Sequence, residues 1–202
     1  MRVLIVDYGM GNISSIIGGL EYHGVSEIVV SNKPEEFKAA DKLILPGVGS
    51  FRSAMNNITS LGIDQYLIDE ILGNKKPVLG ICLGMQLMGK SSSEDGNNLG
   101  LGFIDAKVEQ FPNSNLKVPH VGHNQIQVAK NSKLFEGIKN LSDFYFVHSY
   151  YMTSDESINQ SICNYGVDFI CSYEVNNIFG VQFHPELSQY NGLKIINNFL
   201  KS

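Results

Sequence analysis

The chain has 202 residues, of which 43% are hydrophobic, and a net charge of −5 at pH 7. This length and composition suit one domain covering residues 1–202, and the acidic balance without a Lys/Arg cluster argues against a nucleic-acid-binding protein. No apolar run approaches the roughly 20 residues that cross a membrane, so we expect no membrane segment. The N-terminal apolar run is too short for a signal peptide and the three cysteines suit a reducing compartment, so we expect a cytoplasmic protein.

Strands and helices alternate over the first half of the chain. Apolar runs predict the strands, and apolar residues at helical spacing, with Gly24 and Pro34 as stop and start signals, predict the helices. The predicted strands are 3–6, 27–31, 42–45 and 77–81, and the predicted helices are 13–22, a short one from Pro34, 51–59 and 63–72. This order predicts a parallel sheet with helices on both faces.

The second half of the chain has a different pattern. The Ser-, Gly- and Asn-rich segment 90–98 predicts a surface loop. Antiparallel strands are predicted at 104–111, 124–128, 144–149, 157–165, 167–174 and 178–183, with hairpin turns at 164–166 and 176–177. A C-terminal helix is predicted at 190–200, and no repeat or linker divides the chain.

The sequence predicts neither a bound metal nor a cofactor. Cys82, Cys163 and Cys171 form no metal-binding pair and no even disulfide framework. We expect Cys163 and Cys171 to be buried strand residues in a reducing compartment, the alternative being a contact across a hairpin. Gly9-Met10-Gly11 lacks the third glycine of a dinucleotide-binding fingerprint, and no P-loop is present.

Residues 77–88 contain the most informative motif. An apolar run predicts a buried strand, and the residues from Met85 predict the first turns of a helix. Between them, Gly80-Ile81-Cys82-Leu83-Gly84 matches the Gly-x-nucleophile-x-Gly elbow, with Cys in place of Ser. Glycines without a Cβ would allow the chain to close around a strained nucleophile. The position of Cys82 at a helix N-terminus would favour the thiolate, and the Leu83 amide would be free to meet an oxyanion.

A second motif, His184-Pro185-Glu186, follows the predicted strand 178–183. An extended segment directs residues i and i+2 to the same side, and Pro185 favours extended geometry at His184. His184 and Glu186 are therefore predicted to act together at the carboxyl edge of the sheet, as a base and its orienting group. The alternatives are a solvated histidine beside an unrelated glutamate, and a Cys82 that is simply a small core residue.

The two motifs together resemble those of the class I, or triad, glutamine amidotransferases, and the similarity runs from end to end. Four further stretches, 7–12, 45–51, 118–124 and 144–150, resemble the glutaminase subunits of imidazole glycerol phosphate synthases. The resemblance implies a flavodoxin-like α/β fold, in which a central, mostly parallel sheet is flanked by helices and extended by antiparallel strands.

The resemblance also implies a reaction. Cys82, His184 and Glu186 would form a catalytic triad that hydrolyses glutamine through a thioester. The implied oxyanion residues are Val48, Gly49 and Leu83, and the implied substrate-binding residues are Gly49, Gln86, Ser149 and Tyr150. For Ser149 and Tyr150, the alternative is an ordinary place at the end of a strand.

The resemblance implies a heterodimer as well, because such subunits pass ammonia to a separate (β/α)8 barrel that closes an imidazole ring in histidine biosynthesis. The implied interface residues are Met10, Asn12, His123, Asn124, Tyr145 and Leu187. His123 and Leu187 depart from the Trp and Lys that such subunits usually carry. These departures keep open an alternative partner, an enzyme that amidates a nucleotide-linked sugar for surface polysaccharides.

Two functions of other classes are disfavoured. A catalytically silent regulatory module would have lost a member of the triad, and all three members are present. A free-standing cysteine hydrolase acting on peptides or esters would be favoured by secretion or by an embedded lid domain, and neither is seen.

Overall fold

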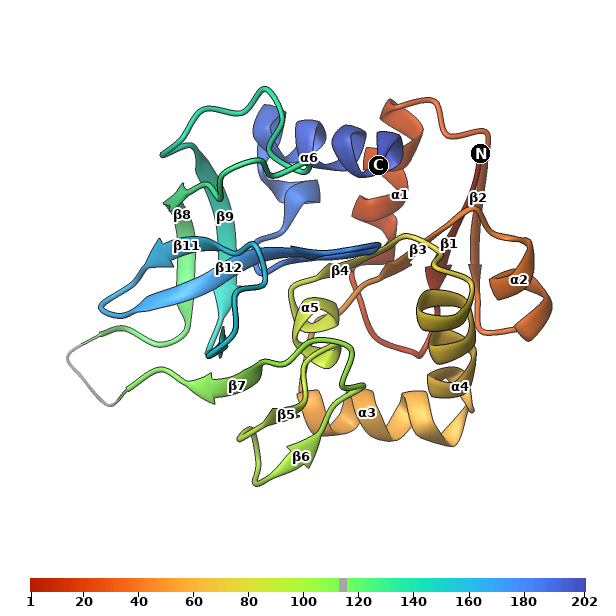
Figure 1. Cartoon of the computed structure of the whole chain (residues 1–202), viewed down its shortest axis with the longest axis horizontal. Coiled ribbons are helices and arrows are strands. Elements are labelled where there is room, and N and C mark those ends of the chain that lie inside the picture. The colour runs from red at the N-terminus through yellow and green to blue at the C-terminus, as the bar shows by residue number, and fades with distance from the viewer. Residues whose placement is uncertain (113–115) are drawn as a thin grey trace.

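One mixed sheet runs through the molecule, and its parallel part combines strands from both halves of the chain (Figure 1). The computed structural model describes residues 1–112 and 116–202. The parallel strands are β1 (Arg2–Val6), β2 (Glu27–Ser31), β3 (Lys42–Leu45), β4 (Val78–Ile81) and β13 (Ile178–Val181). They are ordered β2-β1-β3-β4-β13, so their carboxyl ends meet at one edge, where open α/β sheets bind ligands.

Helices cover both faces of this sheet. They are α1 (Ile13–Tyr22), α2 (Pro34–Ala39), α3 (Phe51–Ser60), α4 (Ile63–Leu67), a π-helical turn η1 (Ile68–Gly73), α5 (Leu83–Leu87), a 3-10 turn η2 (Pro185–Leu187) and α6 (Gln189–Lys201). In Figure 1, α1 and α6 lie above the sheet, and α3, α4 and α5 lie below it. The alternation of β1 explains the two layers: Leu4 and Val6 pack in one buried cluster, and Val3 and Ile5 pack in the other.

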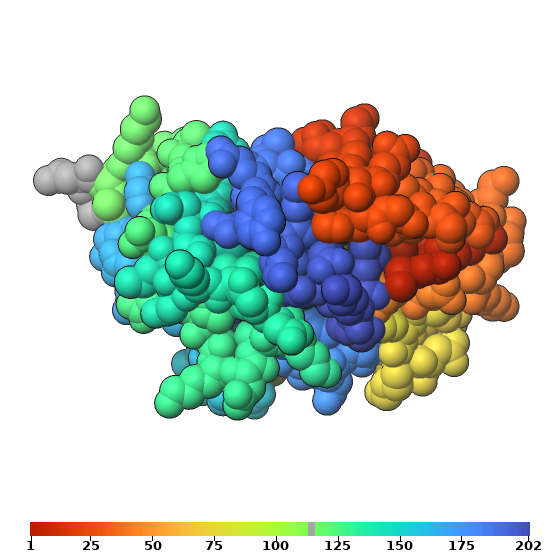
Figure 2. Space-filling view, turned by 90° about the horizontal axis from the view of Figure 1, so that it is seen from above, coloured from red at the N-terminus to blue at the C-terminus, as the bar shows by residue number. Residues whose placement is uncertain are grey.

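Strands that pair antiparallel, except for the parallel pair β5–β7, extend the sheet beyond β13. They are β5 (Ser91–Ser92), β6 (Asn98–Leu99), β7 (Lys107–Gln110), β8 (His120–Gln127), β9 (Asp143–His148), β10 (Tyr150–Thr153), β11 (Ser161–Asn164) and β12 (Asp168–Val175). The antiparallel pair β8–β9 lies off the main path and joins it through β11. Figure 2 shows the C-terminal segment in blue between the N-terminal elements in red and orange and the green and teal part that contains β8 and β9.

The predicted α/β architecture is confirmed, with four corrections. Strand β13 was expected to be only antiparallel; it is antiparallel to β12 but parallel to β4, because the chain returns to the centre of the sheet. The predicted loop 90–98 contains the short strand β5 and the start of β6. Strand β10, which follows a break at Ser149, was not predicted. The helix predicted at 63–72 is α-helical only in its first half.

Cys163 and Cys171 are buried and unpaired, as expected. In the part of the chain that the structure describes, no helix is both long and apolar enough to cross a membrane.

Candidate active site

Cys82 lies at the sharp turn between β4 and α5. Its backbone has φ 52° and ψ −109°, a region that non-glycine residues rarely adopt and that costs about 1–3 kcal/mol. The turn is held on both sides, because Cys82 N–H donates to the Val181 carbonyl at 2.8 Å and the Cys82 carbonyl accepts from Gln86 N–H at 3.3 Å. The strained elbow predicted from the sequence is therefore present.

Glycines make this turn possible by removing the atoms that would collide. A Cβ on Gly84 would lie 1.8 Å from the Leu45 carbonyl oxygen, and one on Gly80 would lie 2.7 Å from Met85 N. Both separations are far shorter than van der Waals contact. The elbow glycines thus allow β3, β4 and α5 to approach each other closely behind Cys82.

The helix that follows Cys82 is short. Helix α5 spans only Leu83–Leu87, so few peptide dipoles add up at its N-terminus. The side chains around the sulfur must therefore provide most of the stabilisation of a thiolate.

His184 and Glu186 are paired beside this elbow. His184 is extended, with φ −95° and ψ 98°, and its N–H donates to the Tyr145 carbonyl at 2.9 Å. Glu186 lies in the 3-10 turn η2 rather than in an extended segment, which corrects the predicted geometry. The pairing nevertheless forms: His184 Nδ1 donates to Glu186 Oε1 at 2.8 Å, and the two side chains are 4% and 1% exposed.

The electrostatics of His184 favour its protonated form. Burial lowers the pKa of the imidazole, but the neighbouring Cys82 and Glu186 outweigh burial and raise this pKa to about 10. Among the described residues, His184 Nε2 has no hydrogen-bond partner of ordinary geometry. Since Nδ1 is committed to Glu186, Nε2 is the atom that is free to exchange a proton with the Cys82 sulfur or with a bound reactant.

A cavity of about 330 Å³ opens at this edge of the sheet. The predicted site residues that line it are Val48, Gly49, Cys82, Leu83, Gln86, Ser149, Tyr150 and His184. The structure thus brings together every predicted oxyanion and substrate residue, while Glu186 supports His184 from behind.

Four cavity residues were not identified as site residues from the sequence: Glu94, Pro119, Val147 and His148. Glu94 comes from the segment between β5 and β6, and its Oε2 accepts from Phe51 N–H at 2.8 Å. Burial raises the pKa of this carboxyl, and the backbone hydrogen bond opposes that shift. A single glutamate in a polar loop carries no sequence signal that separates it from a solvated one.

Gln86 has a defined orientation in the cavity wall. Its Nε2 donates to the Tyr150 carbonyl at 3.0 Å and to Gln182 Oε1 at 2.8 Å. Because these bonds use both amide hydrogens, only Oε1 of Gln86 is available to a ligand, and it can only accept.

The predicted interface residues differ in their contacts. The rings of His123 and Tyr145 are cross-strand partners 5.4 Å apart, and Leu187 is 41% exposed in the turn after Glu186. Met10 packs against the turn that contains Gly49, since the Met10 Cε would lie 2.4 Å from a Cβ on Gly49.

The other two predicted interface residues turn toward the chain itself. The Asn12 side chain donates to Ser15, and Asn124 Nδ2 donates to the Asn164 carbonyl at 3.0 Å and approaches His120 Nε2 at 3.4 Å.

Within the described residues, no group of three or more His, Cys, Asp or Glu side chains could hold a metal ion.

Comparison with known proteins identifies close relatives over the whole chain. Imidazole glycerol phosphate synthase subunit HisH 1 of Campylobacter jejuni (strain RM1221) is 44% identical over 200 residues, covering 98% of this chain and 99% of the relative. Imidazole glycerol phosphate synthase subunit HisH of Methanosarcina barkeri (strain Fusaro / DSM 804) is 46% identical over 201 residues, covering 98% of each.

Solved structures support the same fold. A glutamine amidotransferase from Thermotoga maritima superimposes with a TM-score of 0.66 at 17% identity, covering 100% of this chain and 83% of the other. A family model described as "Glutamine amidotransferase class-I" matches residues 4–202. With that match over almost its entire length, the chain belongs to the class I glutamine amidotransferase family.

Proposed function

We propose that this chain is the glutaminase subunit of an imidazole glycerol phosphate synthase, which hydrolyses glutamine to glutamate and supplies ammonia to a separate synthase subunit. The observation that carries the chemistry is the strained Cys82 at a cavity that His184 also lines, with Glu186 hydrogen-bonded to His184 from behind. The full-length similarity to proteins named as subunits of this synthase supports the pathway.

The proposed reaction has two halves. The Cys82 thiolate attacks the side-chain carbonyl carbon of glutamine and forms a tetrahedral intermediate, which collapses to a glutamyl thioester as the C–N bond breaks. His184 gives its Nε2 proton to the departing nitrogen, and ammonia leaves. The neutral His184 then takes a proton from water, which attacks the thioester and releases glutamate and the thiolate.

Backbone N–H groups would stabilise the negative oxygen of this intermediate. The amide of Leu83 and those of Val48 and Gly49 come from the two turns that border the cavity. Gly49 has φ +111°, a conformation that glycine adopts without strain, so its peptide can reorient at low cost. A substrate or a docked partner can therefore complete this oxyanion site.

The remaining cavity residues suit the amino-acid end of glutamine. The Glu94 carboxylate and Gln86 Oε1 are acceptors, which match the α-ammonium group. The hydroxyl groups of Ser149 and Tyr150 supply donors for the α-carboxylate. This division of acceptors and donors would orient the side-chain carboxamide toward Cys82.

Ammonia released into water would be protonated and lost as a nucleophile, so the acceptor enzyme should dock over the site. We propose a (β/α)8 barrel as that partner, and ring closure is then the partner's reaction, not a lyase activity of this chain. The face around His123, Tyr145 and Leu187 suits docking, because Tyr145 also holds His184 in place through its carbonyl.

The test is reconstitution with the barrel subunit of the same organism. The complex should convert the barrel's nucleotide substrate to imidazole glycerol phosphate with glutamine as the nitrogen source, and neither chain should do so alone. Glutamine hydrolysis without any product from the barrel substrate would exclude the histidine pathway while leaving the glutaminase activity intact.

A second candidate partner is an enzyme that amidates a nucleotide-linked sugar, and the observation that favours it is the pair His123 and Leu187. A histidine is a smaller apolar anchor than the expected tryptophan, and a leucine cannot meet a facing carboxylate. Under this alternative, the double variant His123→Trp with Leu187→Lys binds a histidine-pathway barrel more tightly than the unaltered chain does.

Titration calorimetry against both candidate partners separates the two cases. If the unaltered chain binds the histidine-pathway barrel as tightly as that barrel's own glutaminase does, the two departures are neutral and the sugar-amidating alternative loses its support.

A further inference from the structure

Gln182 lies directly beside the Cys82 nucleophile, although no motif assigns it a role. Strands β4 and β13 are parallel with Ile81 and Val181 in register, so Cys82 and Gln182 are the next residues on the two neighbouring strands. The Gln182 side chain is fully buried, at 0% exposure. A buried carboxamide must satisfy its hydrogen bonds within the protein, and Gln182 Nε2 lies 3.6 Å from Cys82 Sγ.

The orientation of this carboxamide follows from its neighbours. The Tyr150 carbonyl can only accept, so the atom of Gln86 that meets it at 3.0 Å must be Nε2. The same Nε2 lies 2.8 Å from Gln182, so the atom it meets there must be Oε1. The remaining Nε2 of Gln182 then faces the Cys82 sulfur as a hydrogen-bond donor.

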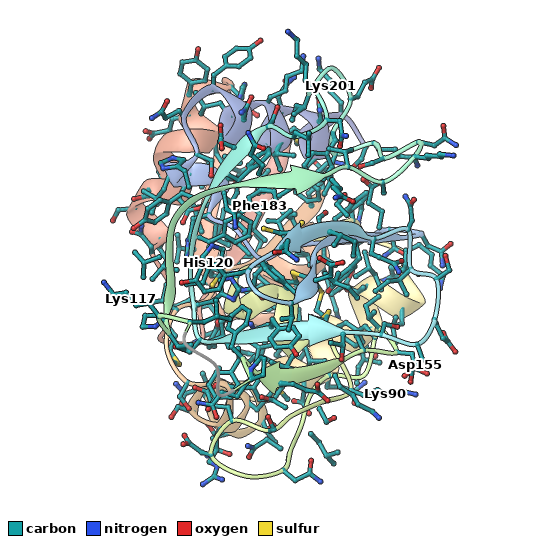
Figure 3. The ribbon with its side chains drawn as sticks, turned by 90° about the vertical axis from the view of Figure 1, so that its left-hand side faces the viewer. Lys90, Lys117, His120, Asp155, Phe183 and Lys201 are labelled. Carbon is teal, nitrogen blue, oxygen red and sulfur yellow. The ribbon has the colours of Figure 1, made fainter. Side chains whose placement is uncertain are left out.

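Two histidines extend this hydrogen-bond network beyond the Tyr150 carbonyl. His148 Nδ1 donates to the Tyr150 carbonyl at 2.8 Å, so the lone pair of neutral His148 is on Nε2, which accepts from His120 Nδ1 at 3.1 Å. Burial lowers the pKa of His148 to about 3 and that of His120 to about 4, so both rings are neutral at pH 7, as this pattern requires. Figure 3 shows His120 among the side chains that fill the interior.

Aromatic packing holds this pair rigidly. The His120 ring stacks on Tyr165 and on Phe146, with centroids 4.0 and 4.9 Å away and an interplanar angle of 20° in each case. The Tyr150 carbonyl is thereby anchored from one side by His148 and serves as a fixed acceptor for Gln86 on the other. The network leaves little freedom for the Gln182 carboxamide to rotate.

We infer that Gln182 is a further catalytic residue: its Nε2–H group donates a hydrogen bond to the Cys82 thiolate, and the buried chain through Gln86, Tyr150 and His148 fixes that donor in place. The inference deepens the proposed glutaminase function and rests on Cys82 being its nucleophile. Hydrogen-bond donors stabilise an anionic sulfur, and here the short helix α5 contributes little. The contact also directs the sulfur toward the cavity.

The test measures the pH dependence of Cys82 alkylation by iodoacetamide in the full chain, because only the thiolate reacts. Buried Cys163 and Cys171 are poor competitors, since burial raises the pKa of Cys163 to about 12 and that of Cys171 well above its usual range. Cys82→Ser gives the background labelling. His184, His148, Tyr8, Tyr150 and Glu94, the titratable groups around the sulfur and its cavity, are the same in every Gln182 variant.

In Gln182→Met, which keeps the side-chain length without the donor, alkylation near neutral pH should be about tenfold slower, and its pH midpoint should move up by about one unit. Gln182→Leu should show the same two effects, because it also lacks the donor. Its side chain has a different shape, so agreement between the variants assigns the effects to the lost donor. The matched control is Asn198→Leu, which removes a buried carboxamide that donates to the Leu134 and Glu136 carbonyls. This control should lose stability without moving the alkylation midpoint.

An unchanged midpoint in folded Gln182 variants overturns the inference. If the variants do not fold, the unaltered chain provides the decisive measurement: the side-chain ¹⁵N resonance of Gln182 should titrate with the alkylation midpoint and should not do so in Cys82→Ser. A Gln182 ¹⁵N resonance that does not shift when Cys82 ionises also overturns the inference. Failure of the proposed function looks different, because the unaltered chain would then be alkylated as expected but would not hydrolyse glutamine in complex with its partner.

Discussion

The charge on Glu186 should set the pH range of the glutaminase reaction. His184 donates to Glu186 at 2.8 Å, and Cys82 and Glu186 raise its pKa from 6.5 to about 10 against the effect of burial. Glu186→Gln keeps an oxygen that accepts from Nδ1, so the ring orientation is retained, but removes the negative charge. A charged acceptor contributes about 1–2 kcal/mol more than a neutral one, so the pKa of His184 should fall by about one unit.

The assay is glutamine hydrolysis by the reconstituted complex between pH 6 and pH 11. In the unaltered complex, activity should decline on the alkaline side only near pH 10, where His184 loses the proton that it gives to the leaving nitrogen. In Glu186→Gln, this decline should move to about pH 9, with a maximal rate about tenfold lower.

Two controls isolate the effect. Ammonium-driven synthesis by the same complexes reports titration of the partner, and Glu94→Gln removes a cavity carboxylate that does not contact His184. Ammonium-driven synthesis should not show this alkaline decline, and Glu94→Gln should not change the pH at which glutamine hydrolysis declines. An alkaline limb that is the same in Glu186→Gln and the unaltered complex would refute the assigned role of Glu186.

The raised pKa of His184 also has a consequence for stability. A group whose pKa is higher in the folded state than in the unfolded state stabilises the folded state. This stabilisation is complete at a pH below the unfolded-state pKa and is lost as the pH rises to the folded-state pKa. The free energy of unfolding should therefore fall between about pH 6.5 and pH 10 in the unaltered chain, and should fall less in Glu186→Gln.

Three further predictions test other parts of the site. Glu94→Gln should raise the KM for glutamine at least tenfold with a smaller change in kcat, because it removes the charge facing the α-ammonium group; an unchanged KM would exclude that contact. Gly84→Ala should lower the free energy of unfolding by about 1–3 kcal/mol in urea titrations, because its Cβ would meet the Leu45 carbonyl, whereas Gly73→Ala, with open space around its Cβ, should not. Glutamine hydrolysis by the isolated chain should be slow and should rise when the liganded partner docks against the Gly49 turn; equal rates would mean that the oxyanion site is already formed.

Most of the parallel framework could be predicted from the sequence, because its signals are local. Strands β2 and β3 and helix α1 begin and end where their apolar patterns begin and end. The elbow was also predictable, since Gly80 and Gly84 mark the positions where a Cβ cannot fit. Cys82 and His184 could be assigned to one site because both follow strands whose carboxyl ends share an edge.

The remaining features depend on tertiary pairing that no local pattern encodes. The apolar run of β13 fits a hairpin with β12 equally well, and only the assembled sheet sets it beside β4. Glu94 reaches the cavity because β5 and β6 fold its loop back toward the start of α3. Gln182 and His120 have no charge or spacing that marks them, and their roles arise from a buried network that spans several strands.

The most direct test of the central claim is the variant Cys82→Ser in the reconstituted complex, assayed with either glutamine or an ammonium salt as the nitrogen source. If Cys82 attacks glutamine, glutamine-dependent product formation should be lost and ammonium-dependent formation should stay at the unaltered rate, because the partner's chemistry does not need the thiol. Retention of the full glutamine-dependent rate in Cys82→Ser would contradict the account, whatever the alkylation and binding experiments show.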